Sequence, residues 1–252
     1  KVSKDFKLNL NNISGFTYLI LPTPHFLIEE CDISFSNNPN KKILKAKHLK
    51  INIFSKNLHK KEKIEFKNIY LNKVDLDLQF NDIKNFNKHL KNNITKPIYI
   101  KNSNLFFSDK EEIISISKID KFEYFVNIQN KEKKLNILGN LFGSNFKFNW
   151  KKNFTNPYVS ISDIKFSSPK INISNKFDKE NENFTIGNTN IELLKNNLDL
   201  NYKFNKNSIE LLDDKIKKIN HSKLIGKIEL DPFFFDLNLI LSGVRLQTVL
   251  NN

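Results

Sequence analysis

Hydrophobic and polar residues alternate along several stretches of the chain. In residues 74–80, apolar side chains occupy every second position, and Asp75 and Asp77 lie between them. A period of two residues is typical of β-strands with one buried and one solvated face, as in most antiparallel sheets. The sequence therefore predicts a mainly β fold, rich in antiparallel pairs. The same pattern returns over residues 122–128, 146–150, 198–204 and 233–241.

The alternation changes phase inside three further stretches, residues 26–35, 64–71 and 159–166. A slip of one residue would turn the apolar side chains of a strand toward solvent unless a β-bulge absorbs it. We therefore expect long, strongly twisted strands with a bulge in each of these three stretches.

Helical patterns are scarce. Residues 82–92 carry Ile83, Phe86 and Leu90 at helical spacing, with Asp82 in position to cap the first turn. A second short helix is expected from Leu246 to the C-terminus. The charged stretch 211–219 is a weaker candidate. The sequence thus predicts one or two short helices, the clearest of them within residues 82–92.

The sequence indicates no domain boundary. The polar stretch 176–183 is the best candidate for a long loop, but strand patterns continue on both sides of it. We therefore predict a single β-rich domain over residues 1–252. Because the chain contains no methionine, we interpret it as a fragment whose N-terminal signal or anchor has been removed.

Composition limits the classes of function. No apolar run approaches the length of roughly 18 residues that a transmembrane helix needs. The formal net charge is +14, but Arg245 is the only arginine, and the lysines are spread along the chain. Proteins that read nucleic-acid sequence rely on arginine for bidentate contacts. The charge therefore favours a solvated basic surface, with an anionic partner such as lipid headgroups as the second reading.

The chain lacks the motifs of a catalytic or metal site. No phosphate-binding loop, dinucleotide fingerprint, nucleophile elbow or zinc-protease motif is present, and the five histidines are scattered. Cys31 stands alone, so it is expected to be a small buried hydrophobe in a strand. Asp75 and Asp77 lie on the polar face of their strand, where solvent is the expected partner. We therefore predict a protein that is not an enzyme and binds no metal or cofactor.

The apolar faces of the alternating strands remain as candidate functional surfaces. They could pack together as a closed sandwich core, or one sheet could curl into a trough that holds acyl chains, and alternation alone does not separate these readings. The candidate lining residues are Val74, Leu76, Leu78, Phe80, Phe122, Tyr124, Val126, Phe146, Phe148, Trp150, Leu198, Leu200, Tyr202, Phe204, Phe233, Phe235, Leu237 and Leu239.

The first half of the chain resembles a known family in its order of elements. Long strand patterns at residues 21–35, 44–53 and 64–78 precede the helical pattern at 82–92, and a second unit follows at 98–109. This order is similar to that of the AsmA-like family, which is related to TamB and to bridge-like lipid-transfer proteins. The resemblance covers about residues 15–140. The turn near residues 57–60 departs from it by lacking the glycine usual before the next strand.

The resemblance implies an elongated, curled β-sheet, groove-like or taco-like, in a protein of the bacterial periplasm anchored in the inner membrane. It implies binding and transfer of phospholipid acyl chains between the inner and outer membranes, with envelope proteins as partners. The main alternative is a structural scaffold that supports outer-membrane assembly through a closed β-sandwich core. A fragment of an outer-membrane barrel is less favoured, because the phenylalanines lie in mid-strand rather than in girdles at strand ends. Nucleic-acid binding is suggested by charge alone.

Overall fold

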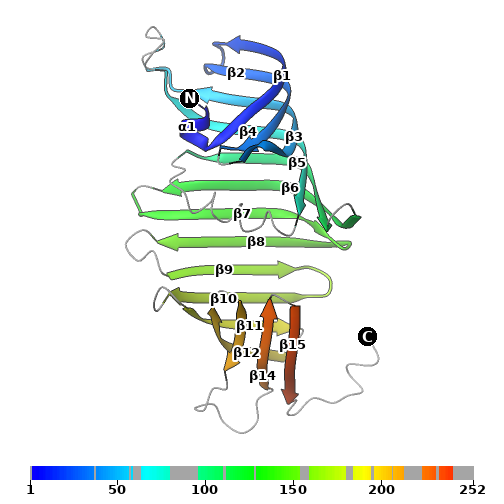
Figure 1. Ribbon diagram of the computed structural model, residues 1–252. Coiled ribbons are helices and arrows are strands. Elements are labelled where there is room, and N and C mark those ends of the chain that lie inside the picture. Colours follow the sequence, from blue (N-terminus) through cyan, green and yellow to red (C-terminus); the bar gives the residue numbers. More distant parts are fainter. Residues whose placement is uncertain are drawn as a thin grey trace. The chain divides into compact units, whose positions relative to one another are not determined.

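The described residues form a fifteen-stranded β-sheet preceded by one short helix (Figure 1). The structure is a computed structural model that describes residues 2–36, 38–56, 58, 64–79, 96–109, 112–127, 129–153, 159–179, 184–193, 196–205, 207–212, 223–230 and 233–240. The elements are α1 (Val2–Phe6), β1 (Leu8–Leu19), β2 (His25–Phe35), β3 (Asn38–Ile53), β4 (Phe66–Gln79), β5 (Ile98–Asp109), β6 (Glu112–Asn127), β7 (Glu132–Leu141), β8 (Ser144–Asn153), β9 (Val159–Phe166), β10 (Ile171–Lys179), β11 (Phe184–Leu193), β12 (Asn196–Asn205), β13 (Ser208–Leu212), β14 (Lys223–Leu230) and β15 (Phe233–Ile240).

The strands pair in their order along the chain, with β1 at one edge of the sheet and β15 at the other. The sheet is largely antiparallel, and the mainly β fold predicted from the alternation is confirmed. The pair β4–β5 is parallel, so the chain must return to the same end of the sheet between these two strands. The strong curl implied by the resemblance is not observed in this sheet.

Helix α1 is the single helix among the described residues, and it was not predicted. The predicted helices at residues 82–92 and from Leu246 onward lie outside the described residues. The weaker candidate at 211–219 begins inside strand β13, and its remaining residues also lie outside the described part.

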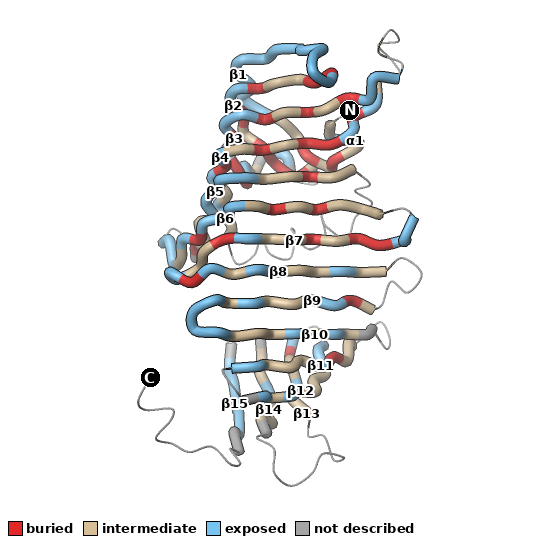
Figure 2. The backbone as a smooth tube through the Cα atoms, turned by 180° about the vertical axis from the view of Figure 1, so that it is seen from behind, coloured by how far each residue is buried: buried red, intermediate tan, exposed pale blue. Residues whose placement is uncertain are grey.

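The chain divides into two compact units, Lys1–Asn149 and Trp150–Asn252, each considered by itself below. The prediction of one domain over residues 1–252 stays a prediction. The units differ in burial. Every buried hydrophobic residue of the described part lies between Phe6 and Leu135, in the first unit. Figure 2 shows most of the buried positions in that unit.

The core of the first unit consists of rows of apolar side chains that cross seven strands. Residues directly opposite one another in neighbouring strands share a face of the sheet. Ile69 and Tyr124 belong to one such row and are completely buried. The row runs through Tyr18, Phe26, Ile51, Ile69, Ile98, Tyr124 and Leu135.

A line of irregular residues crosses the same strands, and we call it the bulge line. In β3, β4 and β5 it consists of His48, Lys73 and Asn102, whose φ angles are 66°, 53° and 49°. A residue in the left-handed conformation interrupts the pleat, so the alternation of side chains between the two faces shifts by one residue where a strand crosses the line. Because neighbouring strands change phase together, the apolar face stays continuous on both sides. The line runs through Gly15, Glu29, His48, Lys73, Asn102 and Asp120.

Two of the three predicted phase changes are confirmed. In β2 the buried positions change from even numbers (Ile28) to odd numbers (Cys31 and Ile33). In β4 the neighbours Asn68 and Ile69 are both buried, which a regular alternation would not allow. The bulge predicted for residues 159–166 is wrong, because β9 pairs with β10 without a register shift. Ile161 instead lies on the solvent-exposed side of β9, where its side chain is 41% exposed.

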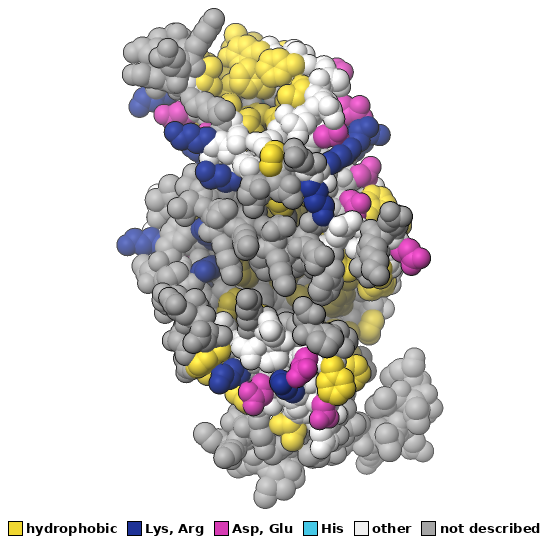
Figure 3. Space-filling model, in the orientation of Figure 1, with side chains coloured by type: hydrophobic (Ala, Val, Ile, Leu, Met, Phe, Trp, Pro, Cys, Tyr) yellow, Lys and Arg dark blue, Asp and Glu magenta, His cyan; other side chains and the backbone are white. Residues whose placement is uncertain are grey.

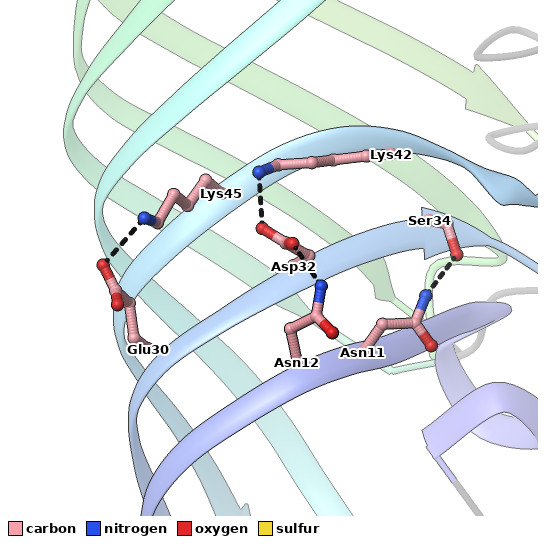
Figure 4. Close-up of polar contacts among 7 residues, drawn as sticks. All are labelled: Asn11, Asn12, Glu30, Asp32, Ser34, Lys42 and Lys45. Carbon is pink, nitrogen blue, oxygen red and sulfur yellow. Dashed lines mark hydrogen bonds and ion pairs between the residues drawn. The ribbon is translucent and has the colours of Figure 1, made fainter.

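The opposite face of the first unit is polar and hydrogen-bonded from strand to strand (Figure 4). Lys42 Nζ lies 2.6 Å from Asp32 Oδ1, and Asn12 Nδ2 donates to Asp32 Oδ2 at 2.8 Å. The Lys42 ammonium, and after it the Asn12 amide, lower the pKa of Asp32. Glu30 pairs with Lys45 at 3.1 Å on the same strands. This face therefore resembles the solvated surface that its lysine and asparagine content predicts.

Candidate functional site

The first unit contains an apolar cavity of about 240 Å³. Its walls come from strands β1 to β7, so the sheet of this unit must be concave enough for the side chains of seven strands to converge. Among the described lining residues, Ser103, Asn104 and the hydroxyl of Tyr124 supply the polar side-chain groups. The lining residues are Leu8, Ile33, Phe35, Ile43, Leu44, Leu71, Val74, Leu76, Leu78, Ile98, Ile100, Ser103, Asn104, Leu105, Ile119, Phe122, Tyr124 and Ile137.

Ser103 contributes little polarity to this cavity. Its hydroxyl donates to the carbonyl of Lys101 at 2.8 Å and accepts from the backbone N–H of Val74 at 3.1 Å. Both interactions are with the backbone at the bulge line, where the ladder is interrupted. The serine thus satisfies local backbone groups, and hydrocarbon covers most of the cavity wall.

Titratable groups on the apolar face lie in a poorly solvated environment. Burial raises the pKa of Tyr124, a lining residue, to about 12. Burial, and to a smaller extent the nearby Asp32 carboxylate, raises the pKa of Cys31 to about 11. Cys31 is a buried small hydrophobe in β2, as predicted, and its thiol is protonated at neutral pH. A dry, uncharged wall of this kind suits hydrocarbon and disfavours ions.

The size of the cavity limits what it could hold. Cavities of about 150 Å³ lined by aliphatic side chains bind benzene, and sites for drug-sized ligands occupy roughly 300–1,000 Å³. A volume of about 240 Å³ lies between these two classes. It suits a segment of one acyl chain and is too small for a complete diacyl lipid.

The apolar face of the first unit becomes exposed at the edge strand β1. Phe16 and Tyr18 belong to rows that are buried in β3 and β4, yet they are 60% and 43% exposed. Their rings each lie 5.2 Å from the ring of Phe26, centroid to centroid. Leu21, in the turn that follows, is 80% exposed. Hydrophobic side chains gather at this end of the unit in Figure 3.

The second unit also has an apolar face, and this face is open. One row joins Phe204, Ile209, Ile228 and Phe235 across β12 to β15. Phe204 is 39% exposed and Phe235 is 59% exposed. Among the described residues of this unit, the fully buried side chains belong to serines, Ser160 and Ser208. Within the described residues, the sheet here presents hydrophobic side chains that no closed core covers.

A cluster of polar side chains interrupts this apolar face. Tyr202 Oη and Thr189 Oγ1 both donate to Asn175 Oδ1, each at 2.7 Å. The three residues come from the neighbouring strands β12, β11 and β10, on the face that also carries Ile173, Phe177 and Leu200. We call Asn175, Thr189 and Tyr202 the polar cluster.

The structure brings the predicted lining residues together in two groups. Val74, Leu76, Leu78, Phe122 and Tyr124 line the cavity of the first unit. Leu198, Leu200, Tyr202, Phe204, Phe235 and Leu237 share one face of the second unit.

Other predicted residues lie apart from these groups or beyond the described part. Val126 stands opposite Lys133, away from the cavity. Phe146 packs beside Gly139, where its ring edge would lie 3.2 Å from an added Cβ. Phe148 is half-buried on β8, and Trp150, also half-buried, belongs to the second unit. Phe80 lies outside the described residues, as do the side chains of Phe233 and Leu239.

Sequence reasoning missed 13 of the 18 described residues that line the cavity. Ile33 and Leu44 in β2 and β3, and Ile98 and Ile100 in β5, were not among the candidates. Their strands change phase at the bulge line, which breaks the alternation into pieces too short to stand out. It also missed Asn175, whose signal is a single polar residue in the otherwise apolar series Ile171, Ile173, Phe177.

No group of three or more His, Cys, Asp or Glu side chains is placed to hold a metal ion in the described part of the chain. Asp75 and Asp77 accept hydrogen bonds from Asn104 and Ser108 on β5, so they cross-link strands on the polar face. None of the described helices has the length and apolar character needed to span a membrane.

Comparisons with protein-family models, with curated proteins and with solved structures found no match for this chain. The family that its sequence resembles is therefore not shown by comparison. The geometry of the two apolar faces is what bears on function.

Proposed function

We propose that this chain binds the acyl chains of phospholipids on the apolar faces of its sheet and has no catalytic activity. The observation that carries the proposal is the relation between Leu71, in the cavity wall, and Phe16, which is 60% exposed at the edge strand. Both belong to one apolar row, with Ile28 and Leu49 between them. A dry hydrocarbon surface that reaches solvent at one edge suits a ligand that enters from that edge.

The energetic argument is the free-energy cost of exposing lipid acyl chains to water. A diacyl phospholipid in water exposes about thirty methylene groups at about 0.8 kcal/mol each, a cost of roughly 25 kcal/mol. An apolar protein surface that covers these groups removes much of that cost without any chemical step. This is consistent with the absence of a recognisable catalytic motif from the sequence.

The cellular setting is part of the same proposal. The resemblance to the AsmA-like family supports a periplasmic location, an anchor in the inner membrane, and transfer of phospholipid toward the outer membrane. The positive charge is compatible with membranes as partners, because each lysine near an anionic surface contributes about 1 kcal/mol. Envelope proteins as further partners are proposed on the same ground.

A non-enzymatic scaffold that supports outer-membrane assembly is the second candidate function. The observation that favours it is the tight core of the first unit, where Ile33, Leu49 and Ile69 are completely buried. A scaffold would use both apolar faces for packing only. The two functions therefore differ in whether lipid enters the cavity.

Photo-crosslinking with a phospholipid that carries a diazirine in its acyl chain separates the two functions. Leu76→Trp would fill the cavity, and Lys67→Trp places the same ring on the exposed face of the same strand as a matched control. We expect labelling of cavity residues in the wild type and in Lys67→Trp, and loss of that labelling in Leu76→Trp. Labelling confined to lysine and asparagine faces, or none in the wild type, would contradict the proposal and leave the scaffold.

A further inference from the structure

The apolar cavity of the first unit has a buried floor. Ile98 and Tyr124 lie opposite each other in its wall, and both are buried. Ile69, the neighbour of Ile98 in the same row, is completely buried. The phenol of Tyr124 is poorly solvated, because burial raises its pKa to about 12. Among the described residues, this row therefore separates the cavity from solvent at one end, and we call it the floor.

The opposite end of the cavity is less covered. Along β4, the lining residues Leu71 and Val74 are buried, whereas Leu76 and Leu78 are half-buried. Leu105 lies opposite Leu76 on β5 and is also half-buried. Because β4 and β5 are parallel, these less covered positions lie together at one end of the two strands. We call this end the mouth of the cavity.

The described lining residues offer no partner for a charged headgroup. They include no acidic or basic side chain and no histidine. A phosphate or carboxylate inside the cavity would be desolvated without a counter-charge, at a large cost in free energy. Near the mouth, Asn104 is exposed, and its amide donates to Asp75 Oδ1 on the solvated face at 2.9 Å. A lipid therefore fits with the methyl end of a chain at the floor and its headgroup outside the mouth.

The volume of the cavity limits how much of a chain can enter. Benzene, with six carbons, binds in a cavity of about 150 Å³, which corresponds to about 25 Å³ for each carbon. On this scale a cavity of about 240 Å³ holds about ten carbons. A diacyl phospholipid has about fifteen methylene groups in each chain. The cavity thus covers the end of one chain and leaves the remainder outside.

We infer that the cavity is a length-limited binding site for the methyl end of a single alkyl chain, about ten carbons deep. This inference rests on the proposed function, since it names the part of the lipid that the first unit recognises. Each methylene group that enters should raise the affinity about four-fold, which corresponds to about 0.8 kcal/mol of transfer free energy. Carbons beyond the tenth stay outside the mouth and should bring no such gain.

Competitive photo-labelling of the full chain tests this inference. The probe is a phosphocholine with one ten-carbon chain and a diazirine at its methyl end. Alkylphosphocholines of six to sixteen carbons compete with it, all below the concentrations at which they form micelles. Mass spectrometry assigns the labelled peptides, so the cavity and the second unit are measured separately. At the cavity, we expect affinity to rise about four-fold per carbon up to about ten carbons and then to level off.

Two substitutions next to the floor should move this limit in opposite directions. Ile100 and Phe122 lie opposite each other, and both line the cavity. Phe122→Leu removes three side-chain carbons and should extend the limit to about thirteen carbons, whereas Ile100→Phe adds three and should shorten it to about seven. Phe125→Leu is the matched control and should leave the limit unchanged. Phe125 lies opposite Lys134 on the same strand and is not a lining residue.

The outcomes separate this inference from the proposed function. An affinity at the cavity that rises steadily to sixteen carbons would overturn the length limit and leave acyl-chain binding intact. Absence of labelling from both units would overturn both proposals. The open face of the second unit should show no limit, and a limit of ten carbons there too would assign it to the probe and contradict the cavity site. Should Phe122→Leu fail to fold, Ile100→Phe still tests the direction of the shift, and an unmoved limit in the folded variants would contradict the inference.

Discussion

The ring of Tyr202 on β12 covers Gly187 on β11, at a position where any Cβ would overlap the ring. Gly187→Ala must therefore displace the tyrosine and break its 2.7 Å hydrogen bond to Asn175. We expect the free energy of unfolding to fall by about 1–3 kcal/mol, as for other overpacked sites. Urea unfolding followed by circular dichroism measures it. In a Tyr202→Ala background the same substitution should cost much less, and an equal cost in both backgrounds would contradict the packing described.

Two phenylalanines on the apolar faces should respond differently to a charge. Phe122 is 9% exposed in the first unit, whereas Phe204 is 39% exposed in the second. Phe122→Asp buries an unpaired carboxylate and should cost about 4 kcal/mol or more. Phe204→Asp should cost roughly 1 kcal/mol or less, because water reaches the site. Thermal unfolding of the two variants is the measurement. Similar large losses would show that the face of the second unit is closed.

The bulge line predicts a stabilising substitution. Lys73 has a φ of 53°, a conformation that costs an L-amino acid roughly 1–2 kcal/mol and costs glycine little. Lys73→Gly should therefore raise the free energy of unfolding or leave it unchanged. Lys67→Gly, at an exposed position on the same strand, should lower it by about 0.5–1 kcal/mol. Equal losses at the two positions in chemical denaturation would mean that residue 73 is not left-handed in solution.

The Asp32–Lys42 pair predicts a dependence of stability on pH. The pKa of Asp32 is lowered in the folded state, so its contribution is fully present above the unfolded value of about 4. The contribution disappears as the pH falls through the lower folded pKa. Asp32→Asn should thus destabilise the protein at pH 7 and have progressively less effect toward pH 2. Denaturant titrations across this range measure the difference, and Lys42→Gln should flatten the same profile. A difference that grows toward acid would contradict the pairing.

The sequence alone determined the type of secondary structure and much of the apolar content of each face. Alternation in residues 74–78, 122–126 and 198–204 is local information, because a strand places every second side chain on the same side. The phase changes in residues 26–35 and 64–71 are local too, and they predicted irregular strands. The prediction failed in β9, where an apolar residue, Ile161, stands on the outward side, a placement that pattern alone does not reveal.

Tertiary structure decided which of these faces meet and what covers them. The parallel pairing of β4 with β5 depends on where the chain returns, which no local pattern encodes. His48, Lys73 and Asn102 are separated by long stretches of chain and become one line only through strand register. Asn175 and Tyr202 meet for the same reason, across a glycine between them. Local patterns determine the side of a strand on which a residue lies, whereas cavities and polar clusters depend on pairings between distant segments.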